Sequence, residues 1–248
     1  MIIKVVNPNT TESMTRMIEA SARGAAGPGT GVIAVGSSAG PASIESHYDE
    51  ALSVPGLLAE ITGGRSADGY VIACFGDPGL DAAREVAAGP VVGIAEAGMR
   101  AATYLGRSFS VVTTLARTAG RAYELVDRYG VRPYCRNVRA CEVPVLELDT
   151  DPNARMRILE ECRAALDVDR AEVIVLGCAG MADLCAELSA KLGVPVVDGV
   201  AAAVAAVEGL LRLGLTTSRA GEYARPPHKA YTGALAGISR TPGVHPRE

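Results

Sequence analysis

The stretch Tyr70-Val-Ile-Ala-Cys74-Phe-Gly-Asp-Pro78 decides the fold, and Val173-Ile-Val-Leu-Gly-Cys178-Ala-Gly-Met181 repeats its pattern. In each, an uninterrupted apolar run leads to a cysteine, and small or turn-forming residues follow at once. Such a run is typical of a buried parallel strand, and the residue just past it lies at the carboxyl edge of the sheet. Open α/β sheets bind their ligands at that edge. The sequence therefore predicts a protein that presents two thiols, Cys74 and Cys178, to one small-molecule ligand.

Apolar runs of strand length recur along the whole chain. The predicted strands are Ile2–Asn7, Gly31–Gly36, Gly69–Phe75, Val91–Ile94, Ser108–Thr114, Asn137–Pro144, Glu172–Cys178 and Pro195–Asp198. Segments rich in Ala, Leu, Glu and Arg separate most of these runs, at lengths suited to crossover helices. The alternation indicates mostly parallel sheets in an α/β fold.

The two halves of the chain repeat one order of elements. Asn7 and Gly31 are 24 positions apart, as are Thr113 and Asn137, while Cys74 precedes Pro90 by 16 positions and Cys178 precedes Pro195 by 17. Regular α/β folds produce similar spacings by chance, but both prolines also begin Pro-Val-Val, which favours duplication. We predict two pseudo-symmetric, doubly wound α/β lobes with the active site in the cleft between them. Residues 1–98 with 215–248 form the first predicted lobe, and residues 99–214 form the second.

Composition limits the class of protein and its partners. The chain has 248 residues, 48% of them hydrophobic, which is enough for a substantial core. The net charge of −4 argues against nucleic acid as a partner, because phosphate neutralisation needs a basic face. We see no secretory leader and no apolar stretch near the ~18 residues of a membrane span. We therefore expect a cytoplasmic protein with no membrane partner, and a homo-oligomer, because compact enzymes of this kind often self-associate.

The six cysteines are interpreted as free thiols, because a reducing compartment disfavours disulfides. No Cys-x-x-Cys pair or zinc-like histidine spacing is present, so we expect no metal site. Cys162 and Cys185 fall in helical patterns and Cys141 in a strand, which favours small buried hydrophobes. Cys135 stays undecided between these interpretations.

The two strand-end cysteines suit acid–base chemistry at carbon. A thiolate is the reactive form of cysteine, and a helix N-terminus lowers its pKa. We expect Asp77 to cap a helix that begins at Pro78, and a second helix to begin just after Cys178. Backbone N–H groups at those helix starts would stabilise an anionic oxygen. One thiolate could then remove a proton next to a carbonyl while the other thiol protonates the opposite face.

Other catalytic schemes fit the sequence less well. Cysteine–histidine catalysis needs an imidazole near the thiol, and His47 falls in a predicted helix over residues 44–62 as a surface or rim residue. A pyridoxal Schiff base needs a suitably placed lysine, which neither Lys4 nor Lys191 offers. No phosphate-binding glycine motif is present. These absences leave a reaction without a cofactor.

Several stretches together resemble the aspartate/glutamate/hydantoin racemase superfamily, and within it the hydantoin and allantoin racemase branch. They are Asn7-Pro-Asn-Thr10, Gly40-Pro-Ala-Ser-Ile-Glu-Ser46, Cys74-Phe-Gly-Asp-Pro-Gly-Leu80, Val112-Thr-Thr114, Gly177-Cys-Ala-Gly-Met181 and Tyr223-Ala-Arg-Pro226. The resemblance spans nearly the whole chain. It implies racemisation without a cofactor, by Cys74 and Cys178, in a cleft between two pseudo-symmetric halves.

The resemblance also implies a set of substrate contacts. These are Asn7, the loop from Ser37 to Pro41, Phe75, Gly76, Thr113, Thr114, Ala179 and Gly180. An asparagine offers both a donor and an acceptor, which matches the alternating N–H and C=O groups of a hydantoin ring. Capping of the following helices is an equally good interpretation of Asn7 and of Thr113 with Thr114.

Two positions depart from the amino-acid racemases of the superfamily. Those enzymes typically carry Cys-Asn-Thr and Cys-Thr-His-like segments, whereas this chain has Phe75 and Ala179 after its cysteines. We therefore predict a racemase of 5-substituted hydantoins or allantoin, which are uncharged cyclic amides. The alternatives are an amino-acid racemase, a maleate-isomerase-like or decarboxylase-like enzyme, and a non-catalytic small-molecule binding module. Unperturbed thiol pKa values would favour the last.

Overall fold

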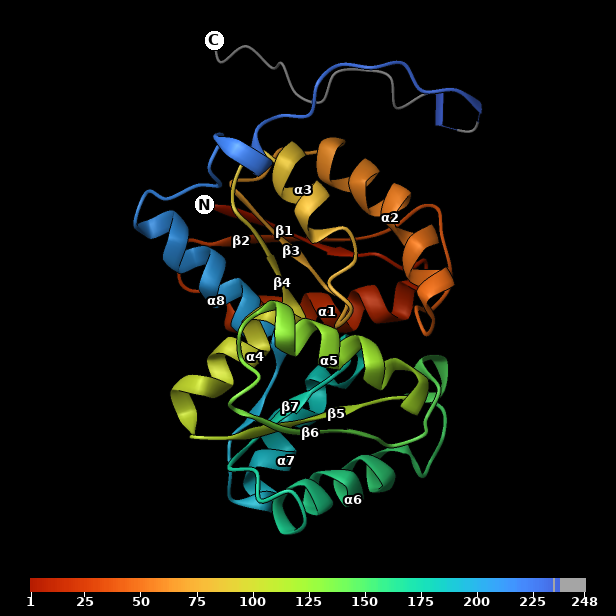
Figure 1. The fold of residues 1–248 in the computed structure, drawn as a ribbon, viewed down its shortest axis with the longest axis vertical. Helices are drawn as coiled ribbons and strands as arrows, with labels where there is room; N and C mark the ends of the chain where they lie inside the picture. The colour runs from red at the N-terminus through yellow and green to blue at the C-terminus, as the bar shows by residue number, and fades with distance from the viewer. Residues whose placement is uncertain (234, 237–248) are drawn as a thin grey trace.

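A computed structural model describes residues 1–233, 235 and 236, and it contains two parallel four-stranded sheets (Figure 1). The first sheet has the order β2-β1-β3-β4, from Gly31–Gly36, Ile2–Asn7, Gly69–Ile72 and Val91–Gly93. The second has the order β6-β5-β7-β8, from Cys135–Ala140, Phe109–Thr113, Val173–Leu176 and Val196–Val197. The second order is the first one repeated, which confirms the predicted two-lobed α/β fold.

Helices follow the strands in both lobes. They are α1 (Glu12–Ala25), α2 (His47–Thr62), α3 (Leu80–Val86), α4 (Ile94–Leu105), α5 (Ala119–Arg128), α6 (Ala154–Asp167), α7 (Cys185–Leu192) and α8 (Gly199–Arg212). Short 3₁₀ helices lie at η1 (Ala116–Thr118), η2 (Val145–Glu147), η3 (Ala179–Leu184) and η4 (Gly221–Tyr223). None of the helices in the described part of the chain is long and apolar enough to cross a membrane.

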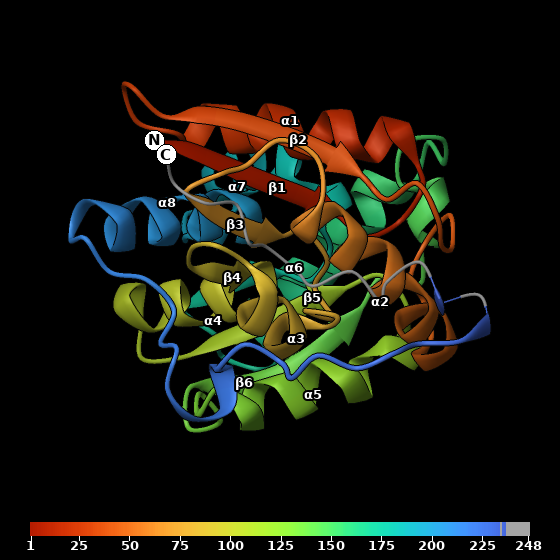
Figure 2. The same cartoon turned by 90° about the horizontal axis from the view of Figure 1, so that it is seen from above.

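Both faces of each sheet are covered, which explains why the central strands read as unbroken apolar runs. In the first lobe, α1 and α8 pack on one face and α2 and α3 on the other (Figure 2). In the second lobe, α6 and α7 cover one face and α4 and α5 the other. Strand β7 is buried along its whole length, from Val173 to Leu176.

The two lobes exchange a helix. Helix α4 follows the first sheet but packs on β5 and β7 of the second, whereas α8 follows the second sheet but packs on β3 and β4 of the first. The two helices also pack on each other, closely enough that a Cβ on Gly199 would lie 2.6 Å from the carbonyl oxygen of Ile94. The division predicted from the sequence, between residues 98 and 99, runs through α4 and leaves α8 in the second predicted lobe.

Asp77 caps a different helix from the one predicted. Helix α3 begins at Leu80, after Gly79 in the left-handed conformation (φ 62°), not at Pro78. The Asp77 carboxylate instead accepts hydrogen bonds from the backbone N–H groups of Ala95 (3.1 Å) and Glu96 (2.9 Å), at the start of α4. The predicted cap was wrong because the loop after β3 passes the end of β4. There the first N–H groups of α4 have no partner within their own helix, and the Asp77 carboxylate accepts them.

The strands stop short of the two cysteines. Strand β3 ends at Ile72 and β7 at Leu176, so Cys74 and Cys178 each lie two residues past a strand. In the second lobe the predicted strand 137–144 is shifted, because β6 occupies Cys135–Ala140. Both cysteines nevertheless lie at the carboxyl edges of their sheets, and the exchange of α4 and α8 brings the two lobes together.

Candidate active site

A cavity of about 180 Å³ lies between the lobes at the carboxyl ends of both sheets. Its wall is formed by Asn9, Met14, Ile44, Glu45, Ser46, His47, Glu50, Ala73, Cys74, Phe75, Gly76, Thr113, Thr114, Arg117, Thr118, Arg121, Ala122, Val145, Gly177, Cys178 and Ala179. A volume of this order accommodates one small ring, because an engineered cavity of about 150 Å³ holds a benzene molecule.

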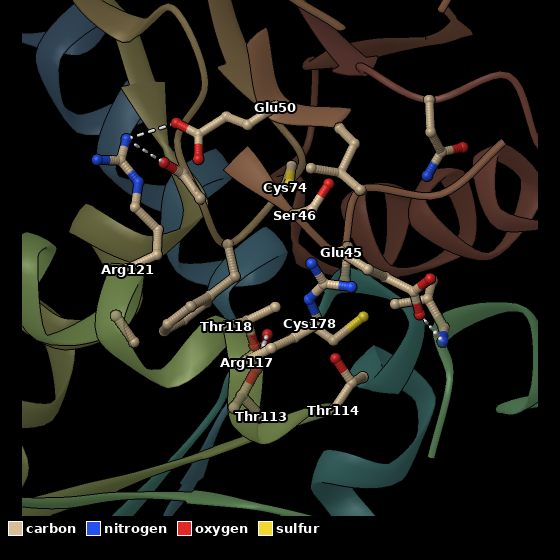
Figure 3. Close-up of a pocket in the computed structure, with 18 of the residues that line it drawn as sticks. Glu45, Ser46, Glu50, Cys74, Thr113, Thr114, Arg117, Thr118, Arg121 and Cys178 are labelled. Atoms are coloured by element: carbon tan, nitrogen blue, oxygen red, sulfur yellow. Dashed lines mark hydrogen bonds and ion pairs between the residues drawn. The ribbon is translucent and has the colours of Figure 1, made fainter. Parts of the chain in front are cut away.

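The two strand-end cysteines enter this cavity from opposite lobes (Figure 3). Cys74 lies in the loop after β3, and Cys178 is the residue immediately before η3. Both are free thiols and both are partly exposed. They are close enough that a charge on Cys178 raises the pKa of Cys74. The structure thus brings the predicted pair of sulfurs to one site.

Burial raises the pKa of the Cys74 thiol and that of the Cys178 thiol to about 12. The direction is opposite to the lowering that we expected from nearby helix starts. Helix α3 begins six residues after Cys74, too far for its N-terminus to act, and the loss of hydration dominates at both thiols. One backbone amide opposes this effect at each site: Gly76 N–H at Cys74, and Gly180 N–H at Cys178.

The predicted substrate contacts divide into two groups. Phe75, Gly76, Thr113, Thr114 and Ala179 line the cavity, whereas Asn7, Ser37, Pro41 and Gly180 do not. All five lining residues come from the two cysteine loops or from the carboxyl end of β5. Asn7 and Ser37 also lie at strand ends, of β1 and β2, but these two strand ends do not face the cavity.

The Asn7 side chain is held by hydrogen bonds inside the first lobe. It is fully buried, and its Nδ2 donates to Asn9 Oδ1 (2.8 Å) and Thr15 Oγ1 (3.1 Å). These bonds orient Asn9, which lines the cavity in its place. Ser37 is likewise turned inward and donates to the carbonyl oxygen of Ala39 (2.5 Å). The capping interpretation of Asn7 comes closer to this arrangement than the substrate-binding one.

The charged residues that line the cavity were not among the site residues predicted from the sequence. They are Glu45, Glu50, Arg117 and Arg121, from α2, α5 and the segments that precede them. Glu50 Oε1 and Arg121 Nη2 form an ion pair of 2.7 Å between the lobes. No periodic signal marks these residues, because they reach the cavity only when the lobes pack together. His47 is exposed at the cavity rim, which confirms its predicted place.

Some polar side chains that line the cavity form hydrogen bonds within the protein, and others do not. Glu45 Oε1 accepts the backbone N–H of Val145 (2.7 Å), and Thr113 Oγ1 lies 3.3 Å from the carbonyl oxygen of Gly177, to which it donates. Within the described residues, Thr114 makes no side-chain hydrogen bond and Arg117 no ion pair. These two remain available to a ligand.

A metal site is not evident in the residues that the structure describes, where no three His, Cys, Asp or Glu side chains converge. The arrangement places two thiols on one small, mostly apolar cavity, where one can act as a base and the other as an acid. Thr114 and Arg117 add a hydroxyl and a cation near them.

Duplicated lobes that each carry a strand-end thiol to one cavity define a class of two-lobed α/β isomerases. The chain belongs to the Asp/Glu/Hydantoin racemase family, whose model matches residues 3–207. It is 48% identical to a hydantoin racemase of Pseudomonas sp. (strain NS671) over 97% of this chain and 98% of that protein. A hydantoin racemase of Rhizobium meliloti is 50% identical over 94% of this chain and 98% of its own length. The solved allantoin racemase of Klebsiella pneumoniae superimposes with a TM-score of 0.94 at 48% identity, over 97% and 99% of the two chains.

Proposed function

We propose that this protein racemises 5-substituted hydantoins or allantoin without a cofactor, by proton transfer to and from two cysteines. The observation that carries the proposal is the placement of Cys74 and Cys178, one from each lobe, on a single small cavity. The similarity to enzymes named hydantoin racemase and allantoin racemase supports the substrate class.

The proposed reaction balances protons and electrons within the two-thiol pair. One thiolate removes the C5 proton, and the electron pair of the C–H bond moves into the adjacent ring carbonyl to give an enolate. The thiol of the other cysteine then gives its proton to the opposite face of C5, and the carbonyl re-forms. The first cysteine ends as a thiol and the second as a thiolate. Exchange of one proton restores the starting state.

The raised thiol pKa values have two consequences for this reaction. At neutral pH both thiols are mainly protonated, so the thiolate that starts the reaction is scarce. A thiolate of high pKa is, however, a strong base, which suits removal of a proton from carbon. Burial also raises the pKa of Cys162, which lies outside the cavity, so the raised values by themselves do not separate a racemase from a binding module.

The cavity wall supports an uncharged ring. Phe75 and Ala179 follow the two cysteines and give apolar contact. Thr114 offers a hydroxyl that can donate to a ring carbonyl or accept from a ring N–H. An α-amino acid would instead need partners for both of its charges, and the residues that directly follow the two cysteines, Phe75 and Ala179, provide none.

A second candidate function rests on Arg117. Its guanidinium lines the cavity without an ion pair among the described residues, and it would attract a carboxylate. An amino-acid racemase, or an enzyme of the maleate isomerase or decarboxylase kind, is therefore the alternative. Analysis of the products formed from carboxylate substrates separates it from the first proposal.

The test is polarimetry of single enantiomers of allantoin and of several 5-alkyl and 5-benzyl hydantoins, each with an enzyme-free control. We expect decay of rotation towards zero that depends on the enzyme, and its loss in Cys74→Ser and in Cys178→Ser. Each variant should still exchange the C5 proton with solvent for one enantiomer. Full racemisation by both variants would refute the two-cysteine assignment, and no decay with any substrate would favour the carboxylate alternative.

A further inference from the structure

Arg121 extends from the second lobe to the loop that carries Cys74. It lies near the start of α5, and its Nη2 contacts Glu50 Oε1 (2.7 Å) and donates to the carbonyl oxygen of Gly76 (3.0 Å) (Figure 3). Its Nη1 contacts Glu124 Oε2 at 3.2 Å. The side chain is 24% exposed and Glu50 is 19% exposed, so the contact between Arg121 and Glu50 is largely shielded from solvent. Arg121 is thus fixed on one side to the first lobe and on the other to its own helix.

Gly76 lies between Arg121 and the thiol. Its carbonyl oxygen accepts from Arg121, and its own N–H lies against the Cys74 sulfur, where it favours the thiolate. A Cβ at Gly76 would lie 3.6 Å from Glu50 Oε2 and 3.9 Å from Cys74 Sγ, so this backbone is enclosed by the ion pair and the thiol. A cation that holds the carbonyl therefore limits rotation about the backbone of Gly76, the same residue whose N–H faces the thiol.

The other cysteine loop is held in a different way. The residue whose N–H faces Cys178 is Gly180, inside η3. A Cβ there would lie 2.9 Å from Leu148 Cδ1 and 3.7 Å from Met14 Cε, so apolar side chains pack on this loop. Met14 is seven residues past Asn7 and Arg121 is eight past Thr113, so the two occupy nearly equivalent places in the duplicated halves. Each lobe braces the other lobe's cysteine, one with a methionine and one with an arginine.

We propose that Arg121 is a positioning residue for Cys74 alone: by holding Gly76 from the opposite lobe, it keeps that N–H directed at the Cys74 thiolate. The inference rests on the proposed racemase function. It states that Arg121 supports the half-reaction in which Cys74 is the base and not the one in which Cys178 is the base. Glu50 keeps the guanidinium in place. Burial raises the pKa of Glu50, and the Arg121 charge opposes that rise.

The effect on the two half-reactions is distinguishable by isotope exchange. Racemisation has an equilibrium constant of one, so kcat/KM for the two enantiomers must fall equally in any variant. Exchange of the C5 proton with D₂O has no such constraint. If Cys74 is impaired, the enantiomer deprotonated by Cys178 still exchanges and returns to its own face, while the other enantiomer neither exchanges nor inverts.

The experiment compares Arg121→Gln with Arg128→Gln. Arg128 is a matched control because it lies on the same helix and also pairs across the lobes, with Asp81, but does not contact Gly76. We expect Arg121→Gln to lower kcat/KM about tenfold to a hundredfold, as for loss of a charge-assisted hydrogen bond at a catalytic group. Arg128→Gln should change it less than about twofold. Arg121→Lys should recover part of the loss and serves as the test if Arg121→Gln does not fold.

The decisive result is which enantiomer keeps its exchange. In Arg121→Gln, exchange should outpace inversion for the same enantiomer as in Cys74→Ser, and not for the one that survives in Cys178→Ser. Equal loss of exchange for both enantiomers would overturn the inference, because a general packing role predicts it. Unchanged kinetics would overturn it as well.

A second readout does not depend on turnover. The rates of alkylation of Cys74 and Cys178 by iodoacetamide, followed by mass spectrometry, report the thiolate at each position. Arg121→Gln should slow Cys74 relative to Cys178, and Arg128→Gln should not. If no substrate is racemised, the proposed function fails while this ratio still tests Arg121, and an unchanged ratio would contradict the inference.

Discussion

Replacement of Asp77 should destabilise the protein strongly, because one buried carboxylate satisfies three donors. Its Oδ1 accepts from Ala95 N–H at 3.1 Å, and its Oδ2 accepts from Glu96 N–H at 2.9 Å and from the Tyr129 hydroxyl at 2.6 Å. The residue is 2% exposed, so water cannot replace these bonds. The three contacts join the Cys74 loop, the start of α4 and the end of α5.

The magnitude follows from the number of donors left without a partner. Asp77→Ala removes both acceptor oxygens and leaves three donors without a partner, and each unsatisfied buried donor costs about 1–3 kcal/mol. Partial relaxation lowers the sum, so we expect a loss of about 3–5 kcal/mol, near the upper end for point mutants. Asp77→Asn keeps one oxygen and turns an amide donor towards another donor, so it should cost about 1–3 kcal/mol.

The assay is urea unfolding followed by circular dichroism, with thermal melting as a second measure. Asp81→Ala is the matched control, because its carboxylate is 52% exposed and should change the free energy of unfolding by no more than about 0.5 kcal/mol. A loss below about 1 kcal/mol for Asp77→Ala would refute the view that this carboxylate caps α4.

Three further predictions concern the cavity and the helix exchange. Because burial raises the pKa of Cys74 and of Cys178 to about 12, the thiolate fraction should grow about tenfold per pH unit. The kcat/KM, corrected for ionisation of the substrate, should therefore rise from pH 7 to 10, and a profile flat over that range would contradict the raised values. Arg117→Ala should raise KM several-fold for substrates whose C5 substituent ends in a carbonyl or carboxylate and leave 5-alkyl hydantoins little changed, as measured by initial rates on both series. Gly199→Ala would place a Cβ 2.6 Å from the Ile94 carbonyl oxygen and should lower stability by about 1–3 kcal/mol in urea unfolding, whereas no change would show that α8 can shift there.

The parts of this structure that could be predicted from the sequence are those with a local signal. A buried parallel strand is a continuous apolar run, so the central strands β1, β3, β5 and β7 were found, and Cys74 and Thr114, which follow two of them, line the cavity. Duplication was visible because intervals between strands are preserved. The prediction that the thiol pKa values would be lowered was wrong. It used the nearby helix starts, which can be read from the local sequence, whereas the desolvation of each thiol depends on residues of the other lobe that cover it.

The remaining features depend on contacts between segments distant in the chain. Asp77 precedes a proline and reads as a cap for the next helix, but its partners lie 18 and 19 residues away. Arg121 and Glu50 meet only across the lobes. Asn7 carries a motif that suits ligand binding equally well, and only its burial shows that its hydrogen-bonding groups are used within the fold.

The exchange of α4 and α8 has a consequence for how the molecule can be divided. Neither half of the chain encodes a finished lobe: a cut at Gly106 would leave β3 and β4 without α8 and would keep α4 apart from β5 and β7. The two halves thus resemble a domain-swapped dimer, in which each half gives one helix to the other, except that a peptide bond joins them. Two fragments would therefore have to be brought together for either sheet to be covered, and the link makes that encounter intramolecular. Because α4 packs on the second sheet and α8 on the first, the contact between these two helices is also a contact between the lobes, and a movement of one lobe against the other would have to change it.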